Sequence, residues 1–362
     1  MSKVVLAMSG GVDSSVAVEL LRREGWEIVG VFMRHGIQLS EEVHRRKHGC
    51  CSEEDAADAQ KVADRYGIPL HILDFHEEFT QIVEYFVDEY LHCRTPNPCI
   101  VCNAKLKFGK LFDFAKSIGA KKVATGHYAR IRDGKIFRGV DATKDQSYVL
   151  HRIQPRYLNH LLFPVGEFHK TEIRQLAEEM GLHVAGKKDS QEICFVPNDD
   201  HAQFVRDYVF QKTGKYPSTT GHFVTTSGQD LGPHEGLERY TIGQRKGLRL
   251  AFREPHYVLR LDAETGEVLL GTHEELACQD LVATQANWLI PTPEKPFSCQ
   301  IKIRYRTPAV QAEVTPLPGG CFQARLQSPL YGIAPGQAAV CYDGDHLLGG
   351  AWLCGKLPLP IV

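Results

Sequence analysis

Short apolar runs alternate with amphipathic stretches over roughly the first 190 residues of the chain. The apolar runs predict buried strands over residues 3–8, 27–33, 70–74 and 121–127. The stretches between them have helical spacing and predict helices over residues 12–25, 52–67 and 104–119. Elements in this order are typical of an α/β fold with a doubly wound parallel sheet, which binds its ligands beyond the carboxyl ends of the strands.

The pattern changes after about residue 200, where the chain becomes rich in glycine and threonine and has short strands at most. From about residue 280, alternating runs separated by proline and glycine predict strands over residues 300–306, 311–317, 321–327, 337–343 and 347–354. We therefore expect three domains. They are a catalytic α/β domain over residues 1–200, a small central module over residues 201–275, and a C-terminal β-barrel or sandwich over residues 276–362.

Composition narrows the class of protein. The 42 basic and 44 acidic residues give a net charge of −2, which excludes the overall basic balance of a dedicated nucleic-acid binder. A polyanionic partner would therefore meet local patches only. No apolar run approaches the roughly 20 residues of a membrane-spanning helix, and the first residues show no signal-peptide pattern. We expect a cytoplasmic protein that has no membrane partner.

The stretch AMSGGVDSS, residues 7–15, lies between a predicted buried strand and a predicted helix. Gly10 and Gly11 allow backbone N–H groups to approach an anion, and the serines and the helix N-terminus add donors and partial positive charge. The Gly-Lys-Ser/Thr sequence of a Walker A loop is absent, which excludes a P-loop kinase or GTPase. The alternative is a tight turn that binds no ligand.

The eleven cysteines divide by their surroundings. Five lie in strand-like apolar runs and are interpreted as buried thiols: Cys278, Cys299, Cys321, Cys341 and Cys354. Cys93, Cys99 and Cys102 share the stretch CRTPNPCIVCN, whose two prolines predict an irregular loop. Cys194 follows the polar residues Asp189, Ser190 and Gln191, which predicts a position near a surface or cleft.

A structural zinc site is one interpretation of the C-x-x-C pair. Such a site usually has four ligands, often from two C-x-x-C knuckles, and this chain has only one. Cys50 and Cys51 are adjacent and Cys93 is six residues away from Cys99, so neither supplies the second knuckle. Zinc is therefore less favoured than sulfur chemistry. A disulfide framework is also disfavoured, because a reducing compartment keeps thiols reduced.

Seven motifs occur in one order along the chain: SGGVDSS, TPNPCIVCN, ATGHYAR, KDQSYVL, KDSQEICF, YTIGQRKGL and IRYR. In this order they resemble the bacterial and organellar tRNA-uridine 2-thiolases, a family of PP-loop ATP pyrophosphatases, from residue 5 to beyond residue 340. The resemblance implies an adenine-nucleotide α-hydrolase-like first domain and a C-terminal β-barrel. It also implies 2-thiolation of the wobble uridine of tRNA, with ATP split into AMP and pyrophosphate.

The resemblance further implies a role for particular residues. ATP would be bound by Ala7, Met8, Ser9, Gly10, Gly11, Val12, Asp13, Ser14, Met33 and Gly126, with Asp13 holding pyrophosphate through Mg²⁺. Cys102 would be the catalytic nucleophile, and Cys194 would receive sulfur as a persulfide from a sulfur-carrier relay protein. The anticodon stem-loop would be contacted by Asn97, Pro98, Cys99, His127, Lys144, Asp145, Gln146, Arg304, Tyr305 and Gln337. We expect a monomer.

Three alternatives remain open at this stage. Cys99, Cys102 and Cys194 are enough thiolates for a four-iron four-sulfur cluster with one open iron, which would supply sulfur as a bound hydrosulfide. A PP-loop amide or lysidine ligase would need no reactive cysteine pair. An iron–sulfur or zinc RNA-binding protein would need no ATP cleavage.

Local basic patches offer a surface for RNA. In the predicted strand over residues 300–306, Ile301, Ile303 and Tyr305 would lie on one face and three cations would lie on the other: Lys302, Arg304 and Arg306. Further cations occur in two clusters, which are Arg245, Lys246, Arg249 and Arg253, and Lys105, Lys107 and Lys110. Solvated surface charge is the alternative interpretation for each of them.

Overall fold

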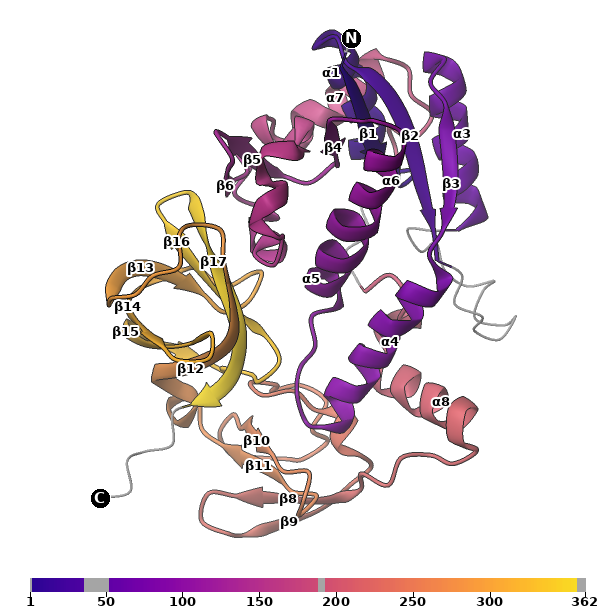
Figure 1. The fold of residues 1–362 in the computed structure, drawn as a ribbon. Helices are drawn as coiled ribbons and strands as arrows, with labels where there is room; N and C mark the ends of the chain where they lie inside the picture. The colour runs from indigo at the N-terminus through magenta and orange to yellow at the C-terminus, as the bar shows by residue number, and fades with distance from the viewer. Residues whose placement is uncertain (1, 36–51, 188–192, 357–362) are drawn as a thin grey trace. The chain divides into compact units, whose positions relative to one another are not determined.

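The computed structural model describes residues 2–35, 52–187 and 193–356. Contacts divide the chain into two compact units (Figure 1). The first unit comprises Met1–Ile82, Cys99–Asp199 and Gly344–Leu347. The second unit comprises Val83–Pro98, Asp200–Asp343 and Leu348–Val362. Because the segment before Cys99 belongs to the second unit, the units are not simple halves of the sequence.

The first unit is built on a parallel sheet of five strands. The strands are β1 (Lys3–Ala7), β2 (Glu27–Arg34), β3 (Leu70–Asp74), β4 (Lys122–Ala124) and β7 (Leu161–Leu162). Their order across the sheet is β3-β2-β1-β4-β7, so the chain moves outward from β1 in both directions. This is the doubly wound arrangement, and the predicted fold class is confirmed. The carboxyl ends of β1, β2 and β4 are neighbours at one edge.

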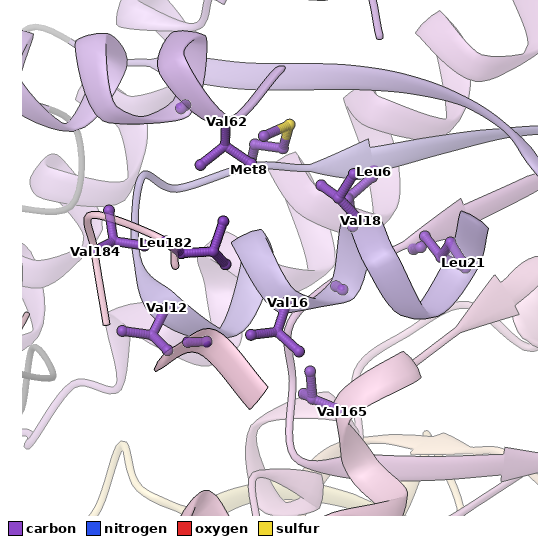
Figure 2. Close-up of a cluster of buried hydrophobic side chains, with 14 of the residues drawn as sticks. Leu6, Met8, Val12, Val16, Val18, Leu21, Val62, Val165, Leu182 and Val184 are labelled. Carbon is purple, nitrogen blue, oxygen red and sulfur yellow. The ribbon is translucent and has the colours of Figure 1, made fainter. Parts of the chain in front are cut away.

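Helices cover this sheet because its strands are apolar. Val4, Leu6 and Met8 pack with apolar residues of α1 (Val12–Arg23), α3 (Glu53–Tyr66) and α7 (Lys170–Glu179). Figure 2 shows this core around Val16 and Val18 of α1. The predicted helix over 52–67 is confirmed, with Ser52 as its N-cap and Gly67 in the left-handed conformation at its end. Helix α6 (Leu111–Ser117) contacts β1 and β4.

The predicted helix over residues 104–119 differs from the structure in kind and extent. A short helix, α5 (Pro98–Cys102), leads into a π-helical segment, Asn103–Lys110, and then into α6. Phe108 leaves helical geometry at φ −120° and ψ 19°. Apolar spacing alone does not distinguish a widened helical turn from a regular one, which is why the prediction missed it. It also missed α4 (His76–Leu91) and the hairpin of β5 (Ala129–Arg132) and β6 (Lys135–Arg138).

The second unit contains two further sheets and a helix. Helix α8 (His201–Thr213) precedes a four-stranded sheet made of β8 (Gly221–Thr225), β9 (Asp230–His234), β10 (Tyr257–Leu261) and β11 (Val268–Gly271). The C-terminal strands are β12 (Ala277–Trp288), β13 (Phe297–Lys302), β14 (Val310–Leu317), β15 (Cys321–Tyr331), β16 (Ala338–Asp343) and β17 (His346–Lys356). Strand β12 pairs with both β15 and β17, which closes these six strands into a barrel. The predicted β-barrel is confirmed.

Short 3₁₀ helices connect these elements, at Ser147–Leu150, Pro155–His160, Pro164–Glu167, Pro197–Asp199, Leu237–Arg239 and Glu274–Leu276. Among the described residues, no single helix has both the length and the apolar character needed to span a membrane.

One predicted strand is too long. Strand β13 ends at Lys302, and residues 304–307 form a turn, so the predicted alternation of Lys302, Arg304 and Arg306 on one strand face is wrong. Ile301 and Ile303 are both buried as expected. Beyond them, the chain turns away from the ladder, and Arg304 binds backbone carbonyls, as described below.

Candidate active site

The glycine loop connects β1 to α1 and is held by its own hydroxyl groups. Gly10 has a φ of +70°, which favours glycine, and Gly11 is the extended N-cap of α1. The Ser9 N–H donates to Ser14 Oγ at 3.2 Å, and Ser15 Oγ donates to the Gly11 carbonyl at 2.8 Å. The helix N-terminus and the backbone N–H groups of this loop are the features that bind phosphate.

Two glycines allow other segments to approach the loop closely. A Cβ atom at Gly10 would lie 2.2 Å from the carbonyl oxygen of Asp55, the third residue of α3. A Cβ atom at Gly126, just after β4, would lie 3.1 Å from Ser14 N. Met33 lies near the end of β2, the neighbour of β1. The predicted nucleotide residues, 7–14 together with Met33 and Gly126, are therefore brought to one edge of the sheet.

Asp13 is oriented by two side chains that were not among the predicted site residues. Lys170 Nζ lies 2.7 Å and 2.8 Å from the two carboxylate oxygens, and Tyr128 OH donates to Oδ1 at 2.7 Å. Lys170 is buried, and its backbone N–H donates to Asp141 at 3.0 Å. One carboxylate beside a phosphate loop is the donor set that Mg²⁺ commonly uses together with phosphate oxygens, so the site fits that ion.

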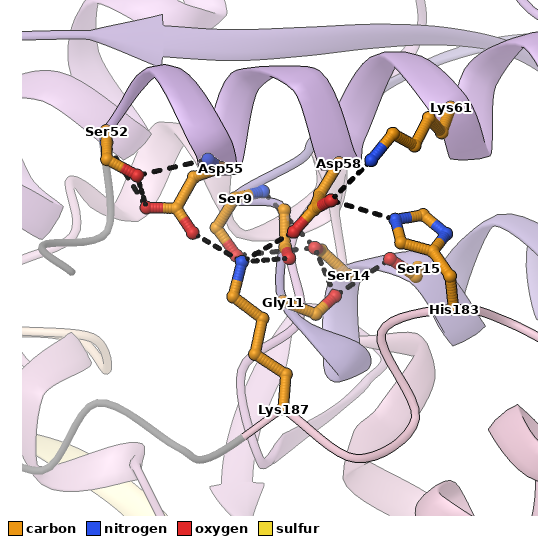
Figure 3. Close-up of polar contacts among 11 residues, drawn as sticks. Ser9, Gly11, Ser14, Ser15, Ser52, Asp55, Asp58, Lys61, His183 and Lys187 are labelled. Carbon is orange, nitrogen blue, oxygen red and sulfur yellow. Dashed lines mark hydrogen bonds and ion pairs between the residues drawn. The ribbon is translucent and has the colours of Figure 1, made fainter.

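A second lysine joins the loop to α3. Lys187 Nζ lies 3.1 Å from the Gly10 carbonyl oxygen, 2.6 Å from Asp55 and 2.8 Å from Asp58. Figure 3 shows the Lys187 side chain directed at Asp55 and Asp58. Burial alone would raise the pKa of Asp58, but hydrogen bonds from Lys187 and His183 outweigh it and lower that pKa. Burial alone would lower the pKa of Lys187, but its hydrogen bonds to Asp55 and Asp58 outweigh burial and raise that pKa. The charges of Asp58 and Lys187 therefore persist through the neutral pH range.

The C-x-x-C pair lies in a helix, which corrects the predicted irregular loop. Pro98 is the first residue of α5, where its missing N–H breaks no hydrogen bond and its fixed φ suits the helix. Cys99 is exposed and Cys102 is half-buried. Cys93, which precedes the prolines, packs against the core of the four-stranded sheet of β8–β11, and burial raises its pKa to about 11. Cys93 is therefore a poor thiolate at neutral pH.

Cys194 is half-buried, and its neighbour Phe195 packs edge-on against Phe79 of α4 with ring centroids 5.6 Å apart. Asp189, Ser190 and Gln191, as well as Cys50 and Cys51, lie outside the described residues. Throughout the described ranges, no three His, Cys, Asp or Glu side chains come close enough to hold a metal ion. We assign no step to a cluster held by Cys99, Cys102 and Cys194.

Three of the five other cysteines are buried as predicted, and two are not. Cys278, Cys299 and Cys341 are buried in the barrel core, and Cys321 is half-buried. Cys354 is exposed, so its prediction as a buried thiol is wrong. It lies one residue after the buried Leu353 on β17, and successive residues of a strand point to opposite faces.

Three family models match consecutive parts of this chain. The tRNA methyl transferase HUP domain matches residues 2–198, the tRNA methyl transferase PRC-barrel domain matches residues 204–272, and the aminomethyltransferase beta-barrel domain matches residues 278–353. The tRNA-specific 2-thiouridylase MnmA of Rhodopirellula baltica is 46% identical over 98% of this chain and 96% of its own length. Those of Geobacter metallireducens and Carboxydothermus hydrogenoformans are each 44% identical, over 97% and 98% of this chain and 96% and 98% of their lengths.

The chain belongs to the tRNA-specific 2-thiouridylase family. The resemblance drawn from the seven motifs is confirmed. The match extends through all three family models, so it covers the thiouridylase motifs in both units. Individual residue roles are not decided by the match, and they depend on the geometry of each side chain.

Among the thiouridylase residues expected to meet tRNA, the polar side chains of His127 and Asp145 are buried. The His127 ring shares a hydrogen bond with Thr125 Oγ1 at 2.7 Å, and burial lowers its pKa well below the usual value. It is neutral at pH 7 and is not a cation for phosphate. The Asp145 carboxylate accepts hydrogen bonds from Gly139 N–H, Ser147 N–H and Ser147 Oγ. The roles of His127 and Asp145 in tRNA binding stay predictions. Both side chains already make hydrogen bonds that stabilise the fold.

Lys144 and Gln146 are half-buried, and Gln146 Oε1 accepts the Tyr128 N–H at 2.9 Å. This bond joins the KDQ motif to the tyrosine that orients Asp13. In the second unit, Tyr305 is 38% exposed with Lys302 Nζ 5.6 Å from its ring centre, so the ring is partly open to solvent. Asn97 is half-buried and Pro98 is buried just before Cys99.

Arg304 and Gln337 bind backbone carbonyls in the second unit. The Arg304 guanidinium donates to the Ile242 carbonyl at 2.8 Å and to the Gly332 carbonyl at 2.6 Å. Gln337 Nε2 donates to the carbonyls of Thr95 and Pro96, each at 3.1 Å. Both side chains therefore have structural partners besides any contact they make with tRNA.

Proposed function

We propose that this protein catalyses ATP-dependent 2-thiolation of the wobble uridine of tRNA. The observation that carries the proposal is that one unit combines a pyrophosphatase-type glycine loop with the thiols of Cys102 and Cys194, in a chain aligned over nearly its whole length with thiouridylases. A ligase built on the same loop would not need these thiols. The wobble base would leave the anticodon stack to reach the site, as base-modifying enzymes require.

Activation comes first in the proposed reaction. The C2 carbonyl oxygen of uridine is a poor leaving group, and its attack on the α-phosphorus of ATP converts it into an adenylate and releases pyrophosphate. Residues 9–14 of the loop would bind the phosphates through backbone N–H groups and hydroxyls. Asp13 would hold a Mg²⁺ ion, which when bound would neutralise charge on the pyrophosphate, and Lys170 would keep the Asp13 carboxylate in one orientation.

Sulfur transfer follows. The terminal sulfur of a Cys194 persulfide attacks C2 and displaces AMP, which leaves the base joined to Cys194 through a disulfide bond. The Cys102 thiolate then attacks the Cys194 sulfur, releasing the thiocarbonyl and forming a Cys102–Cys194 disulfide. A cellular thiol reductant returns both cysteines to thiols. In the second order of events, the Cys102 thiolate first attacks the Cys194 sulfur of the persulfide, which forms the Cys102–Cys194 disulfide and releases hydrosulfide. The hydrosulfide then attacks C2 and displaces AMP.

The experiment is mass spectrometry of tRNA nucleosides after incubation with ATP, Mg²⁺ and a sulfide or persulfide source. We expect 2-thiouridine at the wobble position and one AMP for each base modified. ATP cleavage that yields an amidated or lysine-bearing base would support the ligase alternative. Anaerobic purification with iron and sulfide analysis tests the cluster-bound hydrosulfide. Full activity in iron-free protein would exclude it.

The names of the family models suggest one more control. A parallel incubation with S-adenosylmethionine in place of ATP and sulfide tests methyl transfer. Methylated uridine formed without ATP would overturn the proposal.

A further inference from the structure

The segment between α4 and α5 has no regular secondary structure of its own. Pro96 and Pro98 lack N–H groups, and a residue that precedes proline is restricted to extended conformations. Thr95 and Asn97 are such residues. The carbonyls of an extended segment make no helical hydrogen bonds, so side chains or another segment must satisfy them. This segment continues directly into Cys99 and Cys102.

The partners come from the β15–β16 loop, residues 332–337, of the C-terminal barrel. Gln337 Nε2 donates to the carbonyls of Thr95 and Pro96 at 3.1 Å each. Thr95 N–H donates to the Pro335 carbonyl at 2.7 Å. The two segments therefore exchange hydrogen bonds in both directions, all within the second unit.

Gly336 permits this close approach. Its φ is +86°, and a Cβ atom there would lie 2.7 Å from Glu89 Oε2 and 2.9 Å from the Thr95 carbonyl oxygen. Glu89 in turn accepts hydrogen bonds from the Arg94 guanidinium. A side chain at position 336 would separate the loop from both the end of α4 and the proline segment.

The loop is itself anchored to the barrel. Gly336 N–H donates to the Leu353 carbonyl at 3.0 Å, and Leu353 N–H donates to the Gln337 carbonyl at 2.7 Å. At its other end, the Gly332 carbonyl accepts the Arg304 guanidinium. Gln337 therefore projects from a fixed backbone, and its amide has a defined position against the proline segment.

We infer that Gln337 is a positioning residue for sulfur transfer, which holds the segment that enters the Cys99–Cys102 helix. Its amide donors are already directed at two protein carbonyls, and this geometry gives it a structural role besides any contact with tRNA. The inference rests on the proposed function for its kinetic consequence. The tether itself is independent of the reaction.

Gln337→Met tests this role, because it keeps the length of the side chain and removes both donors. We expect deuterium exchange of residues 94–97 to become faster, since the Thr95 N–H bond weakens when the tether is lost. With saturating tRNA, single-turnover sulfur transfer should fall about tenfold, the scale of losing two hydrogen bonds. Because the rate is measured at saturating tRNA, a change in the Kd for tRNA does not enter it, and the two quantities are determined separately.

Three further variants complete the test. Gly336→Ala should lower the transfer rate in the same way by separating the segments. Gln337→Lys restores a donor and should recover most of the rate at saturating tRNA. The matched control is Gln311→Met, at an exposed position of β14, which should change neither exchange nor rate.

The outcomes separate this inference from the proposed function. Unchanged exchange of residues 94–97 in Gln337→Met overturns the tether, whatever the enzyme does. A raised Kd for tRNA with a normal rate at saturation overturns positioning in favour of an RNA contact. Wild-type protein that makes no 2-thiouridine overturns the proposed function and the kinetic part of the inference, and the exchange result still decides the tether.

Discussion

The glycine loop and the proline segment before Cys102 are both irregular and both lead into a helix, yet they keep their shapes by different means. The hydroxyl contacts that close the loop join residues at most five positions apart, such as Ser9 and Ser14, and Lys187 adds one distant anchor at the Gly10 carbonyl. The proline segment is held by Gln337, which is 242 positions from Thr95. A short-range device can be identified in a sequence, whereas a long-range one depends on how distant parts of the chain fold together.

The largest effect is expected from removing a reacting thiol. Cys102→Ser and Cys194→Ser should each abolish 2-thiouridine formation while pyrophosphate release from ATP persists, because the glycine loop is unchanged. Nucleoside mass spectrometry measures thiolation, and a pyrophosphate assay measures activation. Cys354→Ser, at an exposed cysteine of the barrel, is the control and should have wild-type activity. Thiolation by either of the first two variants would contradict the assignment.

Gly10→Ala tests how closely the loop depends on its neighbour. The added Cβ would meet the Asp55 carbonyl oxygen at 2.2 Å and would also require a left-handed backbone. We expect the free energy of unfolding to fall by about 2–4 kcal/mol and the KM for ATP to rise. Chemical denaturation and steady-state kinetics provide the measurements.

Gly25→Ala is the matched control for that variant. Gly25 has a similar φ of +79°, but a Cβ atom there would meet nothing within 4 Å, so only the backbone cost remains, about 1 kcal/mol. Equal losses in the two variants would show that the contact with α3 is unimportant.

Lys187→Met tests the long-range anchor that joins the glycine loop to α3. The change leaves Asp55 and Asp58 without their shared cation, and we expect a loss of about 2 kcal/mol of unfolding free energy. Lys61→Met is the control, because Lys61 also pairs with Asp58 but is 63% exposed, and its loss should stay below about 0.5 kcal/mol. Denaturation of both variants measures the difference.

The ion pair between Lys187 and Asp58 also predicts how stability depends on pH. The pKa of Asp58 is lowered in the folded protein, so its contribution is complete above the unfolded value of about 3.9 and is lost as the pH falls through the lower folded value. The pKa of Lys187 is raised, so its contribution is complete below about 10.4 and is lost as the pH rises through the higher folded value. The gap between wild type and Lys187→Met should therefore be constant from about pH 5 to 9. A gap that varies across this window would contradict the ion pair.

The smallest effects are expected at the turn after β13. Arg304→Met removes hydrogen bonds to two carbonyls and should lower the unfolding free energy by about 1–2 kcal/mol, whereas Arg306→Met, at an exposed position, should change it little.

Arg304→Glu should weaken tRNA binding, and the salt slope of log Kd should fall by the amount that one phosphate contact contributes. An unchanged slope would remove Arg304 from the RNA surface and leave it only its structural bonds.

Much of the fold follows from local patterns. Apolar runs bounded by glycine predicted β1, β2 and β3 to within about one residue, and the cap signals of Ser52 and Gly67 located α3. The glycine loop could be identified because its donors, its glycines and its helix are contiguous. Lys170 and Lys187 could not, because each is an ordinary helix-end or loop lysine until the fold brings it to Asp13 or to Asp55 and Asp58.

The sequence by itself determined the α/β class, the barrel, the phosphate loop and the family, since these depend on periodicity, on short motifs and on their order. Only the tertiary structure decided that Pro98 begins a helix containing Cys99 and Cys102, that β13 stops before Arg304, and that His127 is buried. The physical reason is the same in each case. Proline removes donors and apolar spacing marks a face, but the partner that satisfies a carbonyl, or covers a ring, lies far away in the chain and is chosen by packing.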